Sequence, residues 1–322
     1  MPETLLEVIN LKTYFLTEAG TARAVDSVSF SVYERQVIGI VGESGCGKSV
    51  TAHSIMRLVP PPGITAGGEI LFNGRNLLGL PEKEMESIRG NEISMIFQEP
   101  MTSLNPIFRI GDQIAEVLLR HKRISNKEAA EQTLHLLRQV GIPSPEIRIR
   151  EYPHKMSGGM RQRVMIAMAI ACNPRLIIAD EPTTALDVTI QAQILALLDT
   201  LRETQGMAVL LITHDLGVIA EMAEEVLVMY TGRVVEHANV KELFKNPLHP
   251  YTQGLMRSIP GRAAGGGKRR LEAIPGVVPS LLDLPPGCKF NTRCPYSFDR
   301  CFREEPGLAA PKGGHPVRCW LY

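Results

Sequence analysis

A glycine-rich segment that ends in a lysine and a serine is the first feature of this sequence that could do chemistry. Residues 42–49 read GESGCGKS and match the pattern G-x-x-x-x-G-K-[ST]. Such glycines let successive backbone N–H groups converge on phosphate oxygens at a helix N-terminus. Lys48 can supply a compact positive charge to the β- and γ-phosphates, and the Ser49 hydroxyl can ligate Mg²⁺. A chance glycine-rich turn is the alternative, and the strand and helix patterns on either side speak against it. The segment predicts a nucleoside triphosphate site lined by Gly42, Glu43, Ser44, Gly45, Cys46, Gly47, Lys48, Ser49 and Val50.

Two consecutive carboxylates, Asp180 and Glu181, follow an apolar run at residues 176–179. An apolar strand that ends in two acids places them at the carboxyl edge of a sheet, where α/β folds bind ligands. Asp180 can orient the Mg²⁺ shell, and Glu181 can polarise a water aimed at the γ-phosphate. A solvated strand end with a helix-capping acid is the alternative. Beside the phosphate motif, the catalytic interpretation is favoured.

Four of the six cysteines crowd into the C-terminal part of the chain as C-x5-C-x6-C-x17-C: Cys288, Cys294, Cys301 and Cys319. Four thiolates suit either a [4Fe–4S] cluster or a structural zinc, and the absence of short C-x2-C pairs weakens zinc. Four free thiols in a loop are the alternative, and a Pro/Gly-rich tail with little core of its own argues against it. Because the phosphate site is assigned to another domain, we expect loss of a cysteine ligand to leave nucleotide affinity nearly unchanged.

Length, composition and charge bound the class of protein. The 322 residues suggest about two domains, and 44% hydrophobic residues exclude global disorder. The 35 Lys and Arg balance 34 Asp and Glu, so no basic excess favours nucleic acid. The longest apolar run, at residues 164–172, is about half of the ~20 residues that span a bilayer, and the first ten residues lack a basic region. We expect a soluble, cytoplasmic chain.

The elements that must position these residues alternate along the chain. Apolar runs predict strands at residues 25–32, 37–41, 67–72, 93–97, 176–179 and 208–212. Helical patterns cover residues 49–58, 113–121, 127–140 and 188–203. This alternation predicts an α/β fold with a parallel sheet covered on both faces. The composition changes near residue 260, where residues 260–267 predict a flexible linker.

A further segment, SGGMRQR at residues 157–163, lies between the helical region and the acidic strand. At this point the chain resembles the ATP-binding-cassette ATPases, which place such a signature just before their acidic strand. By itself the segment could be a helix capped by Ser157. Gln98, the Ala185-Leu186-Asp187 turn and His214 follow in the family's order. A lone glutamine or histidine would be ordinary, but this order makes coincidence negligible.

The resemblance implies a mechanism and a fold. Family members dimerise head to tail, so Ser157, Gly158 and Gly159 would bind the γ-phosphate of the partner's ATP, beside Asp187. His214 would contact the γ-phosphate in its own subunit, and Gln98 would reach Mg²⁺ and the attacking water. Phe15 would stack on adenine, with Tyr14 as the alternative. Val50 stands where many relatives have threonine, so an α-phosphate contact there would come from backbone N–H.

A closer resemblance is to the peptide-importer branch of this family. Residues 97–106, FQEPMTSLNP, and residues 247–252, PLHPYT, are similar to segments of dipeptide and oligopeptide importer ATPases. The implied fold is a P-loop NTPase cassette at residues 1–235, with a RecA-like parallel-sheet core, an N-terminal antiparallel β subdomain and an inserted helical subdomain at about residues 98–158. A C-terminal metal-binding extension would occupy residues 236–322. The branch includes members with an iron–sulfur cluster, which favours [4Fe–4S] over zinc.

The resemblance also implies partners and a location. These are a second ATPase subunit (a sister chain or a second copy), two membrane-spanning permeases and, indirectly, an extracytoplasmic substrate-binding protein. The chain would lie at the cytoplasmic face of a bacterial plasma membrane. A nickel-chelate importer is an alternative cargo class. A soluble cassette ATPase acting on nucleic acid is less favoured, because such proteins usually show a second cassette, a coiled coil or a basic surface. A small-molecule kinase is also less favoured, because it leaves residues 157–163 unexplained.

Overall fold

The computed structural model describes residues 3–184, 186–258, 273–311 and 313–322. The chain divides into two compact units. Unit 1 holds Met1–Leu5, Tyr33–Gln36 and Gly79–Leu211, and unit 2 holds Leu6–Val32, Val37–Leu78 and Ile212–Tyr322. The linker predicted at residues 260–267 lies outside the described residues.

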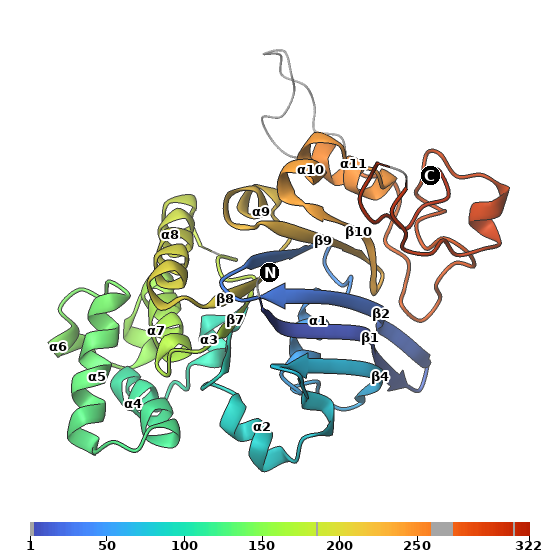
Figure 1. The fold of residues 1–322 in the computed structure, drawn as a ribbon. Coiled ribbons are helices and arrows are strands. Elements are labelled where there is room, and N and C mark those ends of the chain that lie inside the picture. Colours follow the sequence, from blue (N-terminus) through green and yellow to red (C-terminus); the bar gives the residue numbers. More distant parts are fainter. Residues whose placement is uncertain (1–2, 185, 259–272, 312) are drawn as a thin grey trace, which may run out of the picture. The chain divides into compact units, whose positions relative to one another are not determined.

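An antiparallel sheet occupies the N-terminal part of unit 2. Its strands are β1 (Thr4–Thr17), β2 (Gly20–Tyr33), β4 (Gly63–Phe72) and β5 (Arg75–Asn76), in the order β2-β1-β4-β5 (Figure 1). β1 pairs antiparallel with β4, with Leu6 opposite Phe72 and Phe15 opposite Gly63. The antiparallel N-terminal subdomain implied by the resemblance is therefore confirmed.

A second set of strands in unit 2 carries the phosphate motif. The fully buried strand β3 (Val37–Val41) runs parallel to β9 (Glu225–Tyr230), and β10 (Arg233–Asn239) runs antiparallel to β9. The sheet is thus mixed, where the strand–helix alternation predicted a parallel one. The reason is the two-residue connection of Thr231 and Gly232, whose φ angles of 43° and 79° make a tight hairpin that only antiparallel strands can use.

Helices and a long irregular segment complete unit 2. The helices are α1 (Lys48–Ile55), α9 (Leu216–Met222), α10 (Val240–Lys245) and α11 (Pro250–Arg257). The last stretch, drawn orange to red in Figure 1, has little regular structure beyond the 3-10 turn η3 (Asp299–Phe302). It is anchored by Phe290, whose ring centroid lies 5.2 Å from that of Tyr230 and 5.5 Å from that of Tyr251. Aromatic packing thus supplies part of the core that this stretch lacks by itself.

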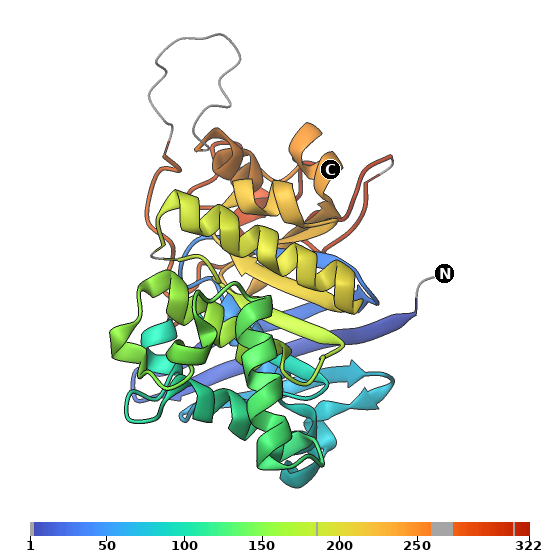
Figure 2. The ribbon, with the colours of Figure 1, turned by 90° about the vertical axis from the view of Figure 1, so that its left-hand side faces the viewer.

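Unit 1 contains the acidic strand and most of the helices. Strands β6 (Ile93–Ile96) and β7 (Leu176–Asp180) are parallel, and β8 (Ala208–Thr213), which begins in this unit, neighbours β7. The helices are α2 (Glu82–Ile88), α3 (Pro100–Ser103), α4 (Ile110–His121), α5 (Asn126–Gln139), α6 (Pro145–Arg148), α7 (Gly158–Ile170) and α8 (Val188–Gln205), with 3-10 turns η1 (Leu77–Gly79) at the unit boundary and η2 (Pro153–Lys155). α4 and α5 lie side by side, in green in Figure 2. Every strand predicted from apolar runs lies within or overlaps an observed strand, whereas β1, β9 and β10 were not predicted from the pattern.

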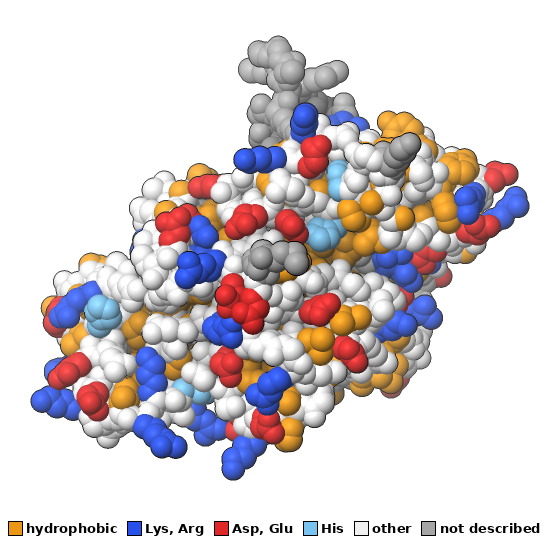
Figure 3. Space-filling view, viewed as in Figure 1, with side chains coloured by type: hydrophobic (Ala, Val, Ile, Leu, Met, Phe, Trp, Pro, Cys, Tyr) orange, Lys and Arg blue, Asp and Glu red, His pale blue; other side chains and the backbone are white. Residues whose placement is uncertain are grey.

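The described surface carries mixed charge. On the face drawn in Figure 3, basic and acidic side chains are interspersed, in keeping with the net charge of +1. Within the part of the chain that the structure describes, no helix combines the length and the apolar character needed to cross a membrane.

Candidate functional site

The glycine-rich segment forms a loop between β3 and α1 in unit 2. Gly47 has a φ of 103°, and a Cβ there would lie 2.1 Å from the Ala24 carbonyl oxygen, so only glycine fits. The Gly232 N–H donates to the Cys46 carbonyl oxygen at 2.8 Å, which ties the loop to the β9–β10 hairpin. Lys48 is buried, and its Nζ donates to the carbonyl oxygens of Gly42 at 2.8 Å and Glu43 at 3.1 Å. The predicted strand–loop–helix setting is therefore confirmed.

Glu43 of this loop is held by two side chains that the sequence analysis did not single out as site residues. Its backbone N–H donates to the Tyr251 hydroxyl at 2.8 Å. Its carboxylate accepts two hydrogen bonds from Arg293, with Nη1 to Oε2 at 2.7 Å and Nη2 to Oε1 at 3.0 Å. No local pattern signals a contact between residues 250 positions apart. Arg293 of the C-terminal extension therefore contacts the phosphate motif, although the sequence assigns the two to different domains.

The acidic pair lies in unit 1, at the end of β7. Asp180 is buried, and Glu181 has a φ of 47°, a left-handed backbone that glutamate seldom adopts. The Glu181 Oε2 accepts from Gln98 Nε2 at 3.1 Å and from Thr184 Oγ1 at 2.8 Å. Backbone strain of this kind clusters at functional sites, where the surroundings hold it. The structure thus brings Gln98 to Glu181, and it adds Thr184, which the sequence analysis missed although it stands in the turn after the acids.

The segment at residues 157–163 begins a helix, also in unit 1. Ser157 is the N-cap of α7, where its hydroxyl accepts from the Met160 N–H at 3.3 Å. Asp187 caps α8 in the same way, accepting from the Ile190 N–H at 3.0 Å. A Cβ on Gly159 would lie 2.9 Å from Ile190 Cγ2, so the starts of α7 and α8 approach closely. The Ser157 and Asp187 side chains are exposed, together with Gly158; Ala185 lies outside the described residues.

The remaining predicted site residues belong to unit 2. His214 is exposed and follows β8. Phe15 is half-buried on β1, where a Cβ on the opposing Gly63 would lie 2.8 Å from the Phe15 Cε1. The Tyr14 hydroxyl donates to Asp26 Oδ1 at 3.0 Å. The predicted residues therefore fall into two sets, the phosphate loop with Phe15 and His214 in unit 2, and Gln98, Asp180, Glu181 and the residues near Ser157 in unit 1.

The four C-terminal cysteines line one narrow cavity of about 10 Å³ in unit 2, with His249, Phe290 and Trp320 among its other walls. Burial raises the pKa of the Cys288 thiol to about 11, and it raises the pKa of the Cys294 and Cys319 thiols as well. Among the described residues, no three or more His, Cys, Asp or Glu side chains have the spacing that would hold a single metal ion. A single zinc needs all four sulfurs about 2.3 Å from one centre, whereas each thiolate of a cubane cluster ligates a different iron. The described structure therefore gathers the four thiols at one cavity without forming a metal site there.

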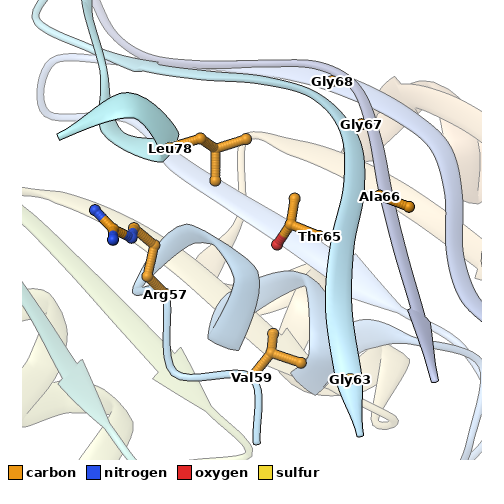
Figure 4. Close-up of a pocket in the computed structure, with 8 residues that line it drawn as sticks. All are labelled: Arg57, Val59, Gly63, Thr65, Ala66, Gly67, Gly68 and Leu78. Carbon is orange, nitrogen blue, oxygen red and sulfur yellow. The ribbon is translucent and has the colours of Figure 1, made fainter. Parts of the chain in front are cut away.

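A larger cavity of about 330 Å³ lies elsewhere in unit 2, beside β4 (Figure 4). Its walls include Arg57, Val59, Thr65 and Leu78 together with glycine backbone. None of the predicted site residues lines it, and it offers no carboxylate, thiol or histidine. This cavity is therefore separate from the predicted chemistry.

Comparison with known proteins places the chain in a family. Residues 25–184 match a family model described as ABC transporter, and residues 235–301 match the oligopeptide/dipeptide transporter C-terminal region. A probable peptide ABC transporter ATP-binding protein of Sinorhizobium fredii is 55% identical over 99% of this chain and 95% of its own length. The dipeptide transport ATP-binding protein DppD of Escherichia coli is 50% identical over 98% of this chain and 96% of its own. The chain belongs to the ATP-binding subunits of peptide ABC transporters.

A solved structure agrees with this family and its fold. The dimeric ATP-binding cassette MJ0796 with ADP and Pi is 28% identical, with a TM-score of 0.66 over 73% of this chain and 99% of its own. The resemblance seen in the sequence is thus confirmed, and this ABC subunit is an ATPase with an α/β cassette fold. The C-terminal match covers Tyr251, Arg293 and the first three cysteines of the cavity.

Proposed function

We propose that this subunit binds and hydrolyses ATP to drive the import of dipeptides or oligopeptides across a membrane. The observation that carries the catalytic part is the Glu181 carboxylate, which two side-chain donors hold in a strained backbone position. A carboxylate fixed in this way at a strand end can accept a proton from an attacking water. The names of the relatives, all of them transport proteins for peptides, support the cargo class.

The roles of the site residues follow from their chemistry. Lys48 would exchange its two carbonyl partners for the β- and γ-phosphates, and the N–H groups of residues 44–50 would hold phosphate oxygens. Ser49, Gln98 and Asp180 would hold Mg²⁺, which neutralises charge on the phosphates when bound. Glu181 would act as general base, and Gln98 would orient the water through the hydrogen bond that the two side chains share. His214 would donate to the γ-phosphate, and Phe15 would stack on adenine.

The signature segment would act on a second ATPase subunit, a sister chain or another copy. The exposed Ser157 hydroxyl, the N–H groups of Gly158 and Gly159 and the start of α7 offer donors to an anion. A γ-phosphate brought by the partner would complete that site, with Asp187 at its edge. ATP binding would then close a head-to-tail dimer, and hydrolysis would reopen it.

The domain assignment and the membrane partners complete the proposal. Residues 1–235 form the cassette, with a helical subdomain at about residues 98–158, and residues 236–322 form the extension. Two permease subunits would receive the subunit at the cytoplasmic face of the membrane, and a substrate-binding protein would deliver the peptide on the other side. Exposed apolar side chains in the helical region, Met101, Ile107 and Phe108, suit such a contact.

The extension would carry a [4Fe–4S] cluster held by Cys288, Cys294, Cys301 and Cys319. The support is that the four thiols line one cavity. Such a cluster would tie together a segment that has little core of its own.

Purification of the intact complex tests the transport role. A tagged Glu181→Gln chain is extracted from membranes with MgATP and a mild detergent, and the captured proteins are identified by mass spectrometry. We expect two permease subunits and an ATPase partner, and we expect peptide to stimulate the ATPase activity of the wild-type complex. Capture of nucleic acid or of soluble proteins alone, without permeases, would refute the transport role.

A further inference from the structure

The phosphate-binding loop is attached to the C-terminal extension at one residue, Glu43. Arg293 and Tyr251, both in the region that characterises the peptide transporters, contact its carboxylate and its backbone N–H. We infer that Arg293 and Tyr251 are positioning residues for the nucleotide, through which the extension sets the ATP affinity of the loop. This inference rests on the proposed role of the loop in binding ATP.

The Arg293–Glu43 contact is a partly buried ion pair with two hydrogen bonds. The Arg293 side chain is 3% exposed and the Glu43 side chain 29%, and both hydrogen bonds are within 3.0 Å. Paired hydrogen bonds between a guanidinium and a carboxylate fix both distance and orientation. The hydrogen bonds to Glu43 raise the pKa of Arg293 despite its burial, so the guanidinium stays charged. Loss of one partner would leave a charge at this site without compensation.

The other hydrogen bonds of Arg293 join it to the extension and to strand β9. Its Nε donates to the Pro275 carbonyl oxygen at 3.0 Å, and its Nη1 lies 3.4 Å from the Tyr230 hydroxyl. The guanidinium therefore contacts the extension at Pro275, the end of β9 and the phosphate loop. A side chain with so many fixed partners has little freedom to follow the loop if the loop moves.

Tyr251 fixes the backbone of the same residue. It is fully buried at the start of α11, with its ring centroid 4.7 Å from that of Tyr230. Because its hydroxyl accepts from the Glu43 N–H, this N–H is already paired with a protein group. Tyr251 and Arg293 thus hold the first turn of the loop at three atoms of Glu43, the backbone N and both carboxylate oxygens.

The chain around Arg293 connects this clamp to the cysteines. Arg293 directly precedes Cys294, and its N–H donates to the Phe290 carbonyl oxygen at 3.0 Å. The Cys288 N–H donates to the Cys301 carbonyl oxygen at 2.8 Å, and Asn291 Nδ2 donates to the Pro286 carbonyl oxygen at 2.8 Å. Order in the cysteine segment therefore places the guanidinium, and a change in that order is transmitted to Glu43. Coupling of this kind is reciprocal and commonly amounts to 5–150-fold in affinity.

Equilibrium binding to the isolated full-length chain tests the inference. The affinity for ATP with Mg²⁺ is measured by displacement of a fluorescent nucleotide for the wild type, Arg293→Gln, Glu43→Gln and the double variant. We expect each single variant to weaken ATP binding about tenfold, and the double variant to be little weaker than either, because both remove the same ion pair. Arg293→Lys keeps the positive charge but cannot donate the paired hydrogen bonds of a guanidinium. We expect its ATP affinity to lie between those of Arg293→Gln and the wild type.

Two controls separate this inference from the proposed function and from general damage. Arg303→Gln makes the same change of charge at an exposed extension residue that pairs only loosely with Asp299, at 3.7 Å, and we expect wild-type affinity. Lys48→Ala changes the proposed nucleotide site itself. An unchanged ATP affinity of this variant would refute the proposed function, not the inference about Arg293 and Tyr251. Where Arg293→Gln does not fold, Tyr251→Phe removes a single hydroxyl, and we expect a several-fold loss of affinity. The inference would be overturned if folded Arg293→Gln or Tyr251→Phe bound ATP as the wild type does and only its melting temperature fell. The two residues would then only stabilise the fold.

Discussion

Glu43 of the phosphate loop in unit 2 and the helix caps of the signature region in unit 1 differ in how far along the chain their hydrogen-bond partners lie. Glu43 of the loop has distant partners. Tyr251 and Arg293, which contact it, lie 208 and 250 residues further along the chain. The caps at the starts of α7 and α8 have nearby partners, since Ser157 and Asp187 each accept from an N–H three residues later. A loop held from afar has a fixed shape before any ligand binds. Two exposed helix starts with only local caps suit a surface that meets a second molecule.

The difference explains how one chain can hold two halves of a composite site. In the proposed site, the phosphate loop binds the nucleotide before the dimer closes, so its shape has to be fixed in advance. The residues that fix it lie far along the chain in unit 2. The half that closes on another subunit's nucleotide has to be accessible. Changes in the phosphate loop and changes in the signature region should therefore have different effects on nucleotide binding, catalysis and stability.

The largest effect is expected for Glu181→Gln. The amide keeps the shape but cannot accept a proton, so ATP hydrolysis should fall about 10²–10⁴-fold while MgATP binding persists. Phosphate release under saturating ATP, beside equilibrium nucleotide binding, measures the two quantities. Glu203→Gln on the exposed face of α8 is the matched control and should hydrolyse ATP at the wild-type rate. Near-wild-type turnover by Glu181→Gln would remove this residue from the catalytic role.

Cys294→Ser should lose its metal. Anaerobically purified wild type should be brown and hold about four irons per chain, whereas this variant should hold little. Residues 288–319 should then exchange amide hydrogens faster, because metal binding contributes folding energy. Through Arg293, we also expect weaker ATP binding. Cys172→Ser in unit 1, outside the cavity, is the control for loss of one thiol. Stoichiometric zinc without iron, in protein made with iron available, would contradict the cluster while keeping the four ligands.

A smaller effect is expected for Ser157→Ala. Loss of this helix cap should cost about 1 kcal/mol of folding free energy, measured by denaturant unfolding without nucleotide. ATP binding by the isolated chain should not change, because Ser157 serves the partner's nucleotide. Ser125→Ala removes the cap of α5 and should cost a similar amount, without any effect on the assembled ATPase. An isolated Ser157→Ala chain that binds ATP more weakly would break the division between the two halves.

Local patterns predicted most of the unit cores and much less of their connections. The fully buried strands β3 and β7 appear as short apolar runs, and the glycine spacing around Gly47 reflects a backbone that no other residue can adopt. Strands β9 and β10 were not predicted from the pattern, and the two-residue hairpin of Thr231 and Gly232 that joins them makes the sheet mixed. The Glu43–Arg293 pair escaped it because an ion pair between distant residues leaves no periodic trace in one sequence. Thr184 could have been found, since a hydroxyl three residues after Glu181 can fold back on its carboxylate.

Nucleotide titration of the isolated chain with Lys48→Ala and Ser157→Arg, each beside the wild type, tests the division of the composite site most directly. Lys48→Ala removes the charge that faces the phosphates, and the affinity for MgATP should fall about 10- to 100-fold. Ser157→Arg overfills the surface that meets the partner's nucleotide, so the isolated chain should bind MgATP as the wild type does, while ATP no longer drives pairing of ATPase subunits. Equal loss of affinity in both variants would contradict the account.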